Sequence, residues 1–225
     1  MARSVGYHGT PRCGRCQLPP RWCLCQELQE IACPVRVDVL MHQQESWRPT
    51  STGHLIKRVL PASALHLHRR ERPIESAAVL QPGRTVWILH PRGEAVTEGV
   101  SNAALQVLLL DGTWRQAGEM VRTVQSWGRL VRVPCAGPSR YWLRSQLEEG
   151  HYCTVEALIF LLEALGLQEA HTVLRLQFEL HVYAALCARG AKSKALEFLA
   201  TSPVRAALGE KIARLTQQRR RELEA

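Results

Sequence analysis

The sequence predicts an α/β protein built on a parallel sheet. Short apolar runs alternate with segments whose apolar residues recur at helical spacing, and this alternation is typical of such sheets. Polar clusters directly follow the apolar runs, at the carboxyl ends of the expected strands, where open α/β sheets bind ligands. We therefore expect a site at one edge of the sheet, assembled from residues that are distant in the chain.

Four apolar runs are expected to form strands, at residues 35–41, 85–89, 105–110 and 130–133. Helical patterns are expected at residues 55–60, 117–124, 155–165, 173–187 and 204–215. Three other segments are expected to be a solvated basic stretch (66–73), a polar connection or short helix (92–104) and a short amphipathic segment (139–150). The chain of 225 residues then divides into a knuckle at 1–34, a main domain at 35–200 and a basic C-terminal helix at 201–225.

Composition and charge narrow the class of protein. The net charge of +9 favours a polyanionic partner such as nucleic acid. With 46% hydrophobic residues the chain can build an ordinary globular core, yet it contains no apolar run long enough to span a membrane. The N-terminus lacks the apolar segment of a signal peptide, so we expect a cytoplasmic protein.

The cysteines are concentrated near the N-terminus, with five of the eight between Cys13 and Cys33. In a cytoplasmic chain such a cluster indicates metal ligands rather than disulfides. Cys13 and Cys16 have the spacing of a zinc knuckle, and Cys23 with Cys25 would complete a closed tetrahedral Zn²⁺ site. Cys33 is an alternative ligand.

Basic residues surround this knuckle. Arg12, Arg15 and Arg21 are suited to phosphate contacts, and Trp22 is suited to base stacking. The alternative is a knuckle that only folds the N-terminus.

The turn Asp111-Gly112-Thr113-Trp114 follows the apolar run 105–110. A carboxylate at the end of a buried strand is costly unless it has a use, so Asp111 is a candidate functional residue. Structural roles stay open for its neighbours: Thr113 with Gln116 fits a capping box, and Trp114 can serve packing alone. Further polar clusters are His42 to Glu45, His90-Pro91, Pro134 with Tyr141 and Arg144, and Cys153-Thr154 with Glu156.

Several sequence motifs of common binding and catalytic sites are absent. Neither G-x-G-x-x-G after the first strand nor G-x-x-x-x-G-K-[ST] occurs, which argues against dinucleotide enzymes, P-loop ATPases and Rossmann-type methyltransferases. H-E-x-x-H and G-x-S-x-G are missing as well. In a parallel sheet the polar clusters at the strand ends can nevertheless converge on one edge.

Together these clusters resemble the DTW-domain family, the tRNA-uridine aminocarboxypropyltransferases, which are related to the SPOUT class of RNA-modifying enzymes. The resemblance runs from about residue 12 to about residue 188 and departs from the family at Ser51, usually Asn, and Cys153, often Ser. It is carried by Asp111-Gly112-Thr113-Trp114 with Arg115, Ala117 and Met120, by His42, Glu45, Arg48-Pro49-Thr50 and Thr52-Gly53, by His90-Pro91, by Tyr141, Leu143 and Arg144, by Thr154, Glu156 and Ala157, and by Cys13, Cys16, Cys23 and Cys25.

The resemblance implies a SPOUT-like knotted parallel sheet with an N-terminal zinc knuckle and C-terminal helices. S-adenosylmethionine would lie in the loops of the knot. The implied reaction transfers its 3-amino-3-carboxypropyl group to N3 of a uridine in tRNA and releases 5′-methylthioadenosine. Three alternatives stay open: aminocarboxypropyl transfer to rRNA, methyl transfer, and a non-catalytic zinc protein that binds RNA. We expect a monomer rather than a homodimer, with no protein partner evident.

The resemblance also suggests roles for single residues. Asp111 is the candidate base for the N3 proton, and Trp114 would stack on the uracil or wall the cofactor. Arg144 would pair with the carboxylate of the transferred group. The expected cofactor-binding residues are Leu89, His90, Pro91, Leu110, Asp111, Gly112, Thr113, Pro134, Tyr141, Arg144, Thr154 and Glu156. The expected RNA-binding residues are Arg12, Arg15, Arg21, His42, Arg48, Arg69, Arg70 and Arg115.

Overall fold

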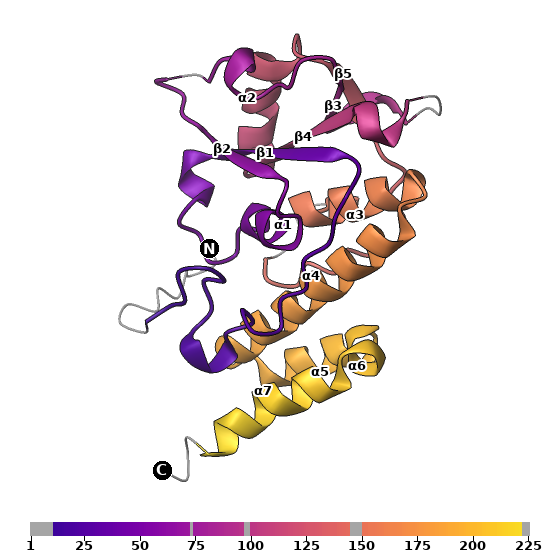
Figure 1. Ribbon diagram of the computed structural model, residues 1–225. Helices are drawn as coiled ribbons and strands as arrows, with labels where there is room; N and C mark the ends of the chain where they lie inside the picture. Colours follow the sequence, from indigo (N-terminus) through magenta and orange to yellow (C-terminus); the bar gives the residue numbers. More distant parts are fainter. Residues whose placement is uncertain (1–10, 73, 97–99, 145–149, 222–225) are drawn as a thin grey trace. The chain divides into compact units, whose positions relative to one another are not determined.

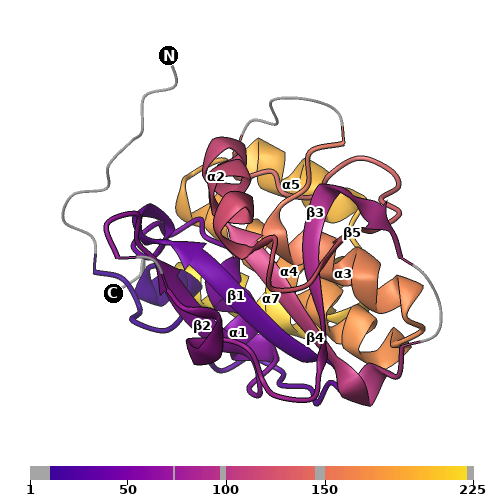
Figure 2. The same cartoon turned by 90° about the horizontal axis from the view of Figure 1, so that it is seen from above.

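Five parallel strands form the sheet of this protein. The computed structural model describes residues 11–72, 74–96, 100–144 and 150–221. The strands lie side by side in the order β2-β1-β4-β3-β5 (Figures 1 and 2). Their bounds are β1 Arg36–His42, β2 Ala64–His68, β3 Thr85–Ala95, β4 Leu105–Asp111 and β5 Arg129–Arg132.

Helices cover both faces of the sheet. Helix α2, Trp114–Val124, lies on one face, and α1, Gly53–Val59, and α3, Thr154–Ala164, lie on the other (Figure 1). Met120 and Val124 of α2 are fully buried in one core cluster with Leu40, Ile88 and Leu108, one residue from each of three neighbouring strands. Because side chains alternate along a strand, the adjacent residues of each strand face the other layer of the core.

The remaining helices follow α3 in the chain. They are α4 Gln168–Ala188, α5 Lys192–Ala200, α6 Val204–Ala207 and α7 Gly209–Arg221, and short 3-10 turns occur at Pro20–Trp22, Gln43–Glu45, Ser76–Ala78 and Asn102–Ala104. Gly166 and Gly190, which follow α3 and α4, have φ angles of 69° and 74°, a conformation that glycine adopts without steric cost. Within the described ranges, no helix is both long enough and apolar enough to cross a membrane.

The chain forms two compact units. One joins residues 1–27 to residues 179–225, and the other contains residues 28–178 with the whole sheet. In the first unit, α7 packs near the turn Pro20–Trp22, and Lys211 Nζ donates to the carbonyl of Glu27 at 3.1 Å. Arg214 also contacts the Glu27 carboxylate at 3.3 Å, so the N-terminal and C-terminal segments are joined by charge as well as by packing.

The structure confirms the parallel α/β class and the four expected strands, and it corrects other expectations. Residues 66–73 were expected to be a solvated stretch, but Ala64–His68 is an edge strand paired only with β1. Residues 139–144 are not helical, and 145–149 lie outside the described residues. Strand β3 continues to Ala95, α5 was not expected, and the last helix is divided into α6 and α7.

Candidate functional site

A pocket of about 520 Å³ opens at the carboxyl ends of β4 and β5 and beside residues 89–91 of β3, inside the unit that contains the sheet. This size is typical of sites for small molecules and cofactors. The location also agrees with the sequence, which places polar clusters after these strands. Eleven of the predicted residues line the pocket: Leu89, His90, Pro91, Leu110, Asp111, Gly112, Thr113, Trp114, Tyr141, Arg144 and Thr154.

Asp111 ends β4 and is held by hydroxyl groups from two other elements. Ser51 donates to Asp111 Oδ2 at 2.9 Å, and Thr154 donates to Asp111 Oδ1 at 2.6 Å. The carboxylate is only 4% exposed, and this burial raises its pKa, while the two hydroxyls act in the opposite direction. Asp111 therefore ties together β4, the loop before α1 and the start of α3.

Gly53, the first residue of α1, permits this arrangement. A Cβ atom at this position would lie 2.8 Å from Asp111 Oδ2 and 2.8 Å from Met41 Cε. Both contacts are closer than carbon atoms tolerate, so a larger residue would displace the carboxylate. The absence of a side chain at Gly53 thus leaves space for the carboxylate of Asp111.

A second cluster combines one buried carboxylate with two guanidinium groups. Glu45 is 1% exposed, and its oxygens accept from Arg48 at 2.6 Å and from Arg144 at 2.8 Å. Arg144 also donates to Thr50 Oγ1 at 2.9 Å, while the Tyr141 hydroxyl donates to the Thr50 carbonyl. The cluster carries one positive charge in excess, beside a pocket that Glu45 and Arg144 both line.

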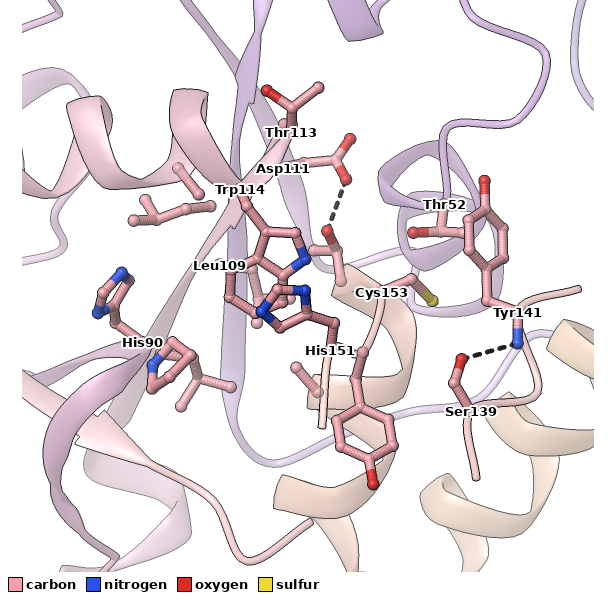
Figure 3. A pocket seen from close by; sticks show the side chains of 18 of the residues that line it. Thr52, His90, Leu109, Asp111, Thr113, Trp114, Ser139, Tyr141, His151 and Cys153 are labelled. Carbon is pink, nitrogen blue, oxygen red and sulfur yellow. Dashed lines mark hydrogen bonds between the residues drawn. The ribbon is translucent and has the colours of Figure 1, made fainter. Parts of the chain in front are cut away.

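Trp114 lies at the pocket and is 37% exposed. The ring of His151 stacks on it, with 4.0 Å between ring centroids and 24° between ring planes (Figure 3). Thr113, immediately before it, forms the predicted capping box: Gln116 N donates to Thr113 Oγ1 at 3.3 Å, and Thr113 N donates to Gln116 Oε1 at 2.8 Å. The structural role of Thr113 is therefore confirmed.

Two predicted cofactor residues lie outside the pocket lining. Pro134 lines a separate cavity with Arg132 and Val133. Glu156 is buried, and it accepts hydrogen bonds from Ser139 Oγ at 2.9 Å, from Arg140 N at 2.6 Å and from Cys153 N at 2.9 Å. Burial raises the pKa of Glu156, and its three donors work against that shift. Its contacts fix the loop that carries Tyr141 and the start of α3.

The structure also adds residues that sequence reasoning did not place in the site. Ser51, Ser139 and His151 line the pocket. A serine or histidine in a connecting segment gives no periodic pattern, so no local feature of the sequence distinguishes these three. Ser51 and Asp111 are 60 positions apart, and Asp111 and Thr154 are 43 apart.

The four knuckle cysteines converge in the other compact unit. All four sulfur atoms lie within 4.8 Å of one another, with 3.5 Å between Cys13 and Cys25 and 3.7 Å between Cys16 and Cys23. A tetrahedral ion with metal–sulfur bonds of about 2.3 Å requires sulfur separations of about 3.8 Å, so the donor set fits a metal such as zinc. Cys33 belongs to the unit with the sheet and is not part of this cluster.

The predicted RNA-binding residues are distributed over both units. Arg12, Arg15 and Arg21 accompany the knuckle, where Arg12 donates to the Gln17 carbonyl and Arg21 lies over the Trp22 ring. The others belong to the unit with the sheet, where Arg69, Arg70 and Arg115 are exposed and His42 and Arg48 are partly buried. Arg15 of the knuckle is exposed as well.

Comparisons with known proteins identify the family of this chain. The DTW domain matches residues 10–187. The tRNA-uridine aminocarboxypropyltransferase 2 of Mus musculus is 29% identical over 150 residues, which cover 60% of this chain and 50% of the mouse protein. The chain thus spans about half the length of that curated relative, and no solved structure matches it significantly. Since the domain match covers most of the sequence and contains every residue that lines the pocket, the chain belongs to the DTW-domain family.

Proposed function

We propose that the protein transfers the 3-amino-3-carboxypropyl group of S-adenosylmethionine to N3 of a uridine in tRNA, with release of 5′-methylthioadenosine. The observation that carries this proposal is the pocket at the strand ends, because the turn Asp111 to Trp114 lines it together with Arg144 and Thr154. The mouse relative, named as a tRNA-uridine aminocarboxypropyltransferase, supports the same class of reaction.

The pocket suits the two ends of S-adenosylmethionine. Leu89, Leu109 and Val131 give it apolar walls on which an adenine ring can pack. The cluster of Glu45, Arg48 and Arg144 has one positive charge in excess, which a carboxylate of the donor would balance. When bound, S-adenosylmethionine supplies a sulfonium from which a carbon group can be displaced.

The main contribution of the chain itself to catalysis is to position the reacting groups. A sulfonium can lose any of three substituents, so the product depends on where the site holds the nucleophile. Asp111 fixes the loop before α1 and the start of α3 around the pocket, and Trp114 gives a ring on which a flipped base can stack. The other proposed cofactor contacts are Leu89, His90, Pro91, Leu110, Gly112, Thr113, Tyr141 and Thr154, with Pro134 and Glu156 acting from outside the lining.

RNA binding is proposed for the basic residues of both units. The knuckle, with Zn²⁺ on its four cysteines, would present Arg12, Arg15 and Arg21 to the phosphate backbone. His42, Arg48, Arg69, Arg70 and Arg115 would contact the same RNA from the unit with the sheet. A trefoil knot stays a prediction of the resemblance. A cytoplasmic location and a monomeric state stay predictions from the sequence.

Mass analysis of tRNA nucleosides after incubation with S-adenosylmethionine tests the proposal. We expect one uridine to gain the mass of an aminocarboxypropyl group, and 5′-methylthioadenosine to appear in equal amount. A gain of one methyl group would identify a methyltransferase instead. Modification of rRNA but not tRNA would change the substrate, and failure to bind S-adenosylmethionine in calorimetry would favour a non-catalytic zinc protein that binds RNA.

A further inference from the structure

Two acidic side chains line the described part of the pocket, and they differ in their counter-charges. Glu45 accepts hydrogen bonds from two guanidinium groups, one of which belongs to Arg144. Asp111 accepts from the hydroxyls of Ser51 and Thr154, both of which are neutral, and the described residues give it no ion-pair partner. Asp111 is therefore a buried carboxylate whose charge is not balanced by the groups that bond it.

The hydrogen bonds of Asp111 suit an ionised carboxylate that can bind a further donor. Each oxygen accepts from one hydroxyl, Oδ2 from Ser51 and Oδ1 from Thr154. Since a carboxylate oxygen can accept two hydrogen bonds, each retains the capacity for one more. Burial raises the pKa of Asp111, so a cation beside the carboxylate would stabilise its ionised form.

Adjacent residues of the loop before α1 connect this carboxylate to a guanidinium group. Thr50 Oγ1 accepts from Arg144 Nη2 at 2.9 Å, and Ser51, the next residue, donates to Asp111 Oδ2 at 2.9 Å. All four residues line the pocket, and the guanidinium lies close enough to act on the pKa of Asp111. The pocket thus has a positive and a negative charge on neighbouring parts of its wall.

An α-amino acid in its zwitterionic form matches this pair of charges. Its carboxylate can bond the guanidinium of Arg144, and its ammonium, attached to the adjacent carbon, can donate to Asp111. S-adenosylmethionine carries such a group at one end, whereas 5′-methylthioadenosine has the nucleoside and the sulfur without it. The two charges therefore distinguish a donor that has its amino-acid end from one that lacks it.

We propose that Asp111 binds the ammonium of the donor, and that Asp111 and Arg144 together form a subsite for an α-amino acid zwitterion. This inference rests on the proposed function. The amino-acid end is the part of S-adenosylmethionine that is transferred, so the subsite holds the group that moves to the uridine. The by-product 5′-methylthioadenosine carries neither charge and gains nothing from the subsite.

Calorimetry with three related nucleosides tests the subsite. S-adenosylhomocysteine has the complete amino-acid end, its deaminated analogue keeps only the carboxylate, and 5′-methylthioadenosine has neither group. Asp111→Asn removes the charge but keeps the side-chain shape, and we expect it to weaken binding of S-adenosylhomocysteine by about 10- to 100-fold. Its affinity for 5′-methylthioadenosine should not change, which also shows that the pocket is intact.

The wild type gives a second measurement that does not depend on a folded variant. It should bind the deaminated analogue about 10- to 100-fold more weakly than S-adenosylhomocysteine. Asp111→Asn should bind this analogue at least as tightly as the wild type does, because the ion pair is absent in both complexes. Equal affinity of the wild type for S-adenosylhomocysteine and its deaminated analogue would overturn the proposal.

Arg132→Gln is the matched control, because Arg132 also lines the pocket but is an exposed residue of β5. It should leave the ratio of the affinities for S-adenosylhomocysteine and 5′-methylthioadenosine unchanged. If Asp111→Asn weakened both ligands equally, or lowered the transfer rate without weakening either, as loss of a general base would, the subsite would be refuted. Failure of the wild type to bind S-adenosylmethionine or to modify tRNA would instead refute the proposed function itself.

Discussion

At the scale of single residues, the buried carboxylate of Asp111 makes a pH-dependent contribution to stability. Thr154→Val removes the donor at 2.6 Å from Asp111 Oδ1 while keeping the side-chain shape. Burial raises the pKa of Asp111, and the Thr154 hydroxyl opposes this shift by stabilising the ionised form, so loss of this donor penalises mainly the ionised form. We expect a destabilisation of about 1–3 kcal/mol near pH 8, as for an unsatisfied buried group.

The sign of the pH effect follows from that shift. As the pH falls through the pKa of folded Asp111, the carboxyl takes up a proton, and the missing donor matters less. The difference in unfolding free energy between Thr154→Val and the wild type should therefore shrink under acidic conditions, measured by urea denaturation. Thr172→Val, at an exposed position of α4, is the control and should show no such dependence. A loss that stays constant with pH would contradict the account.

At the scale of secondary-structure elements, a second prediction concerns the cap at the start of α2. Thr113 and Gln116 form a reciprocal capping box, and Thr113 also lines the pocket. Thr113→Ala should destabilise the protein by about 1 kcal/mol, the usual cost of losing a cap. Thr113→Ser keeps the hydroxyl and should restore both stability and transfer rate. If Thr113→Ser folded normally but transferred poorly, the residue would have a role in the site beyond capping.

The sequence predicted the central elements of the fold and missed those with weaker patterns. Strands β3 and β4 contain near-continuous apolar runs, because helices cover both faces of the sheet, whereas β1 alternates before its apolar run and β5 has only two apolar residues between arginines. β2, Ala64–His68, is an edge strand in which two histidines interrupt the apolar residues, so its pattern suggested a solvated segment. The short helix α5 has no strong apolar stripe to separate it from its surroundings.

The pocket lining includes predicted residues that follow strands, and Tyr141 and Arg144 from a loop, but also Ser51, Ser139 and His151, which the sequence did not indicate. Asp111 and His90 were identifiable because parallel strands end at one edge of the sheet. Ser51 and His151 reach the pocket only through the path of the chain, which local sequence does not encode. Glu156 looked like a cofactor ligand beside Thr154, yet its carboxylate is used by the loop at Ser139.

At the scale of the whole molecule, metal binding and cofactor binding can be tested independently, because the cysteine cluster and the pocket belong to different compact units. We expect one zinc per chain, and Cys16→Ser should abolish it because Cys16 is a buried member of the cluster. Affinity for tRNA at fixed ionic strength should then fall, while affinity for S-adenosylmethionine stays the same, because the pocket belongs to the other unit. Metal analysis, RNA titration and calorimetry measure the three quantities.

Cys33→Ser provides the matched control for this experiment. Cys33 lies outside the cluster, so the variant should keep its zinc and its affinity for tRNA. Loss of zinc from Cys33→Ser would show that the ligand set differs from the four clustered cysteines. Unchanged tRNA affinity in Cys16→Ser would mean that the knuckle does not bind RNA.

The pairing of the first and last segments in one unit also constrains the order in which the protein can fold as it is synthesised. Residues 28–178 form a unit of their own and can fold while later residues are still being added. The knuckle leaves the ribosome before the sheet, but the contact between Glu27 and Lys211 of α7 closes a separation of 184 positions. Zinc could hold the nascent knuckle in shape during this interval, so metal supply would influence the yield of folded protein before it influences activity.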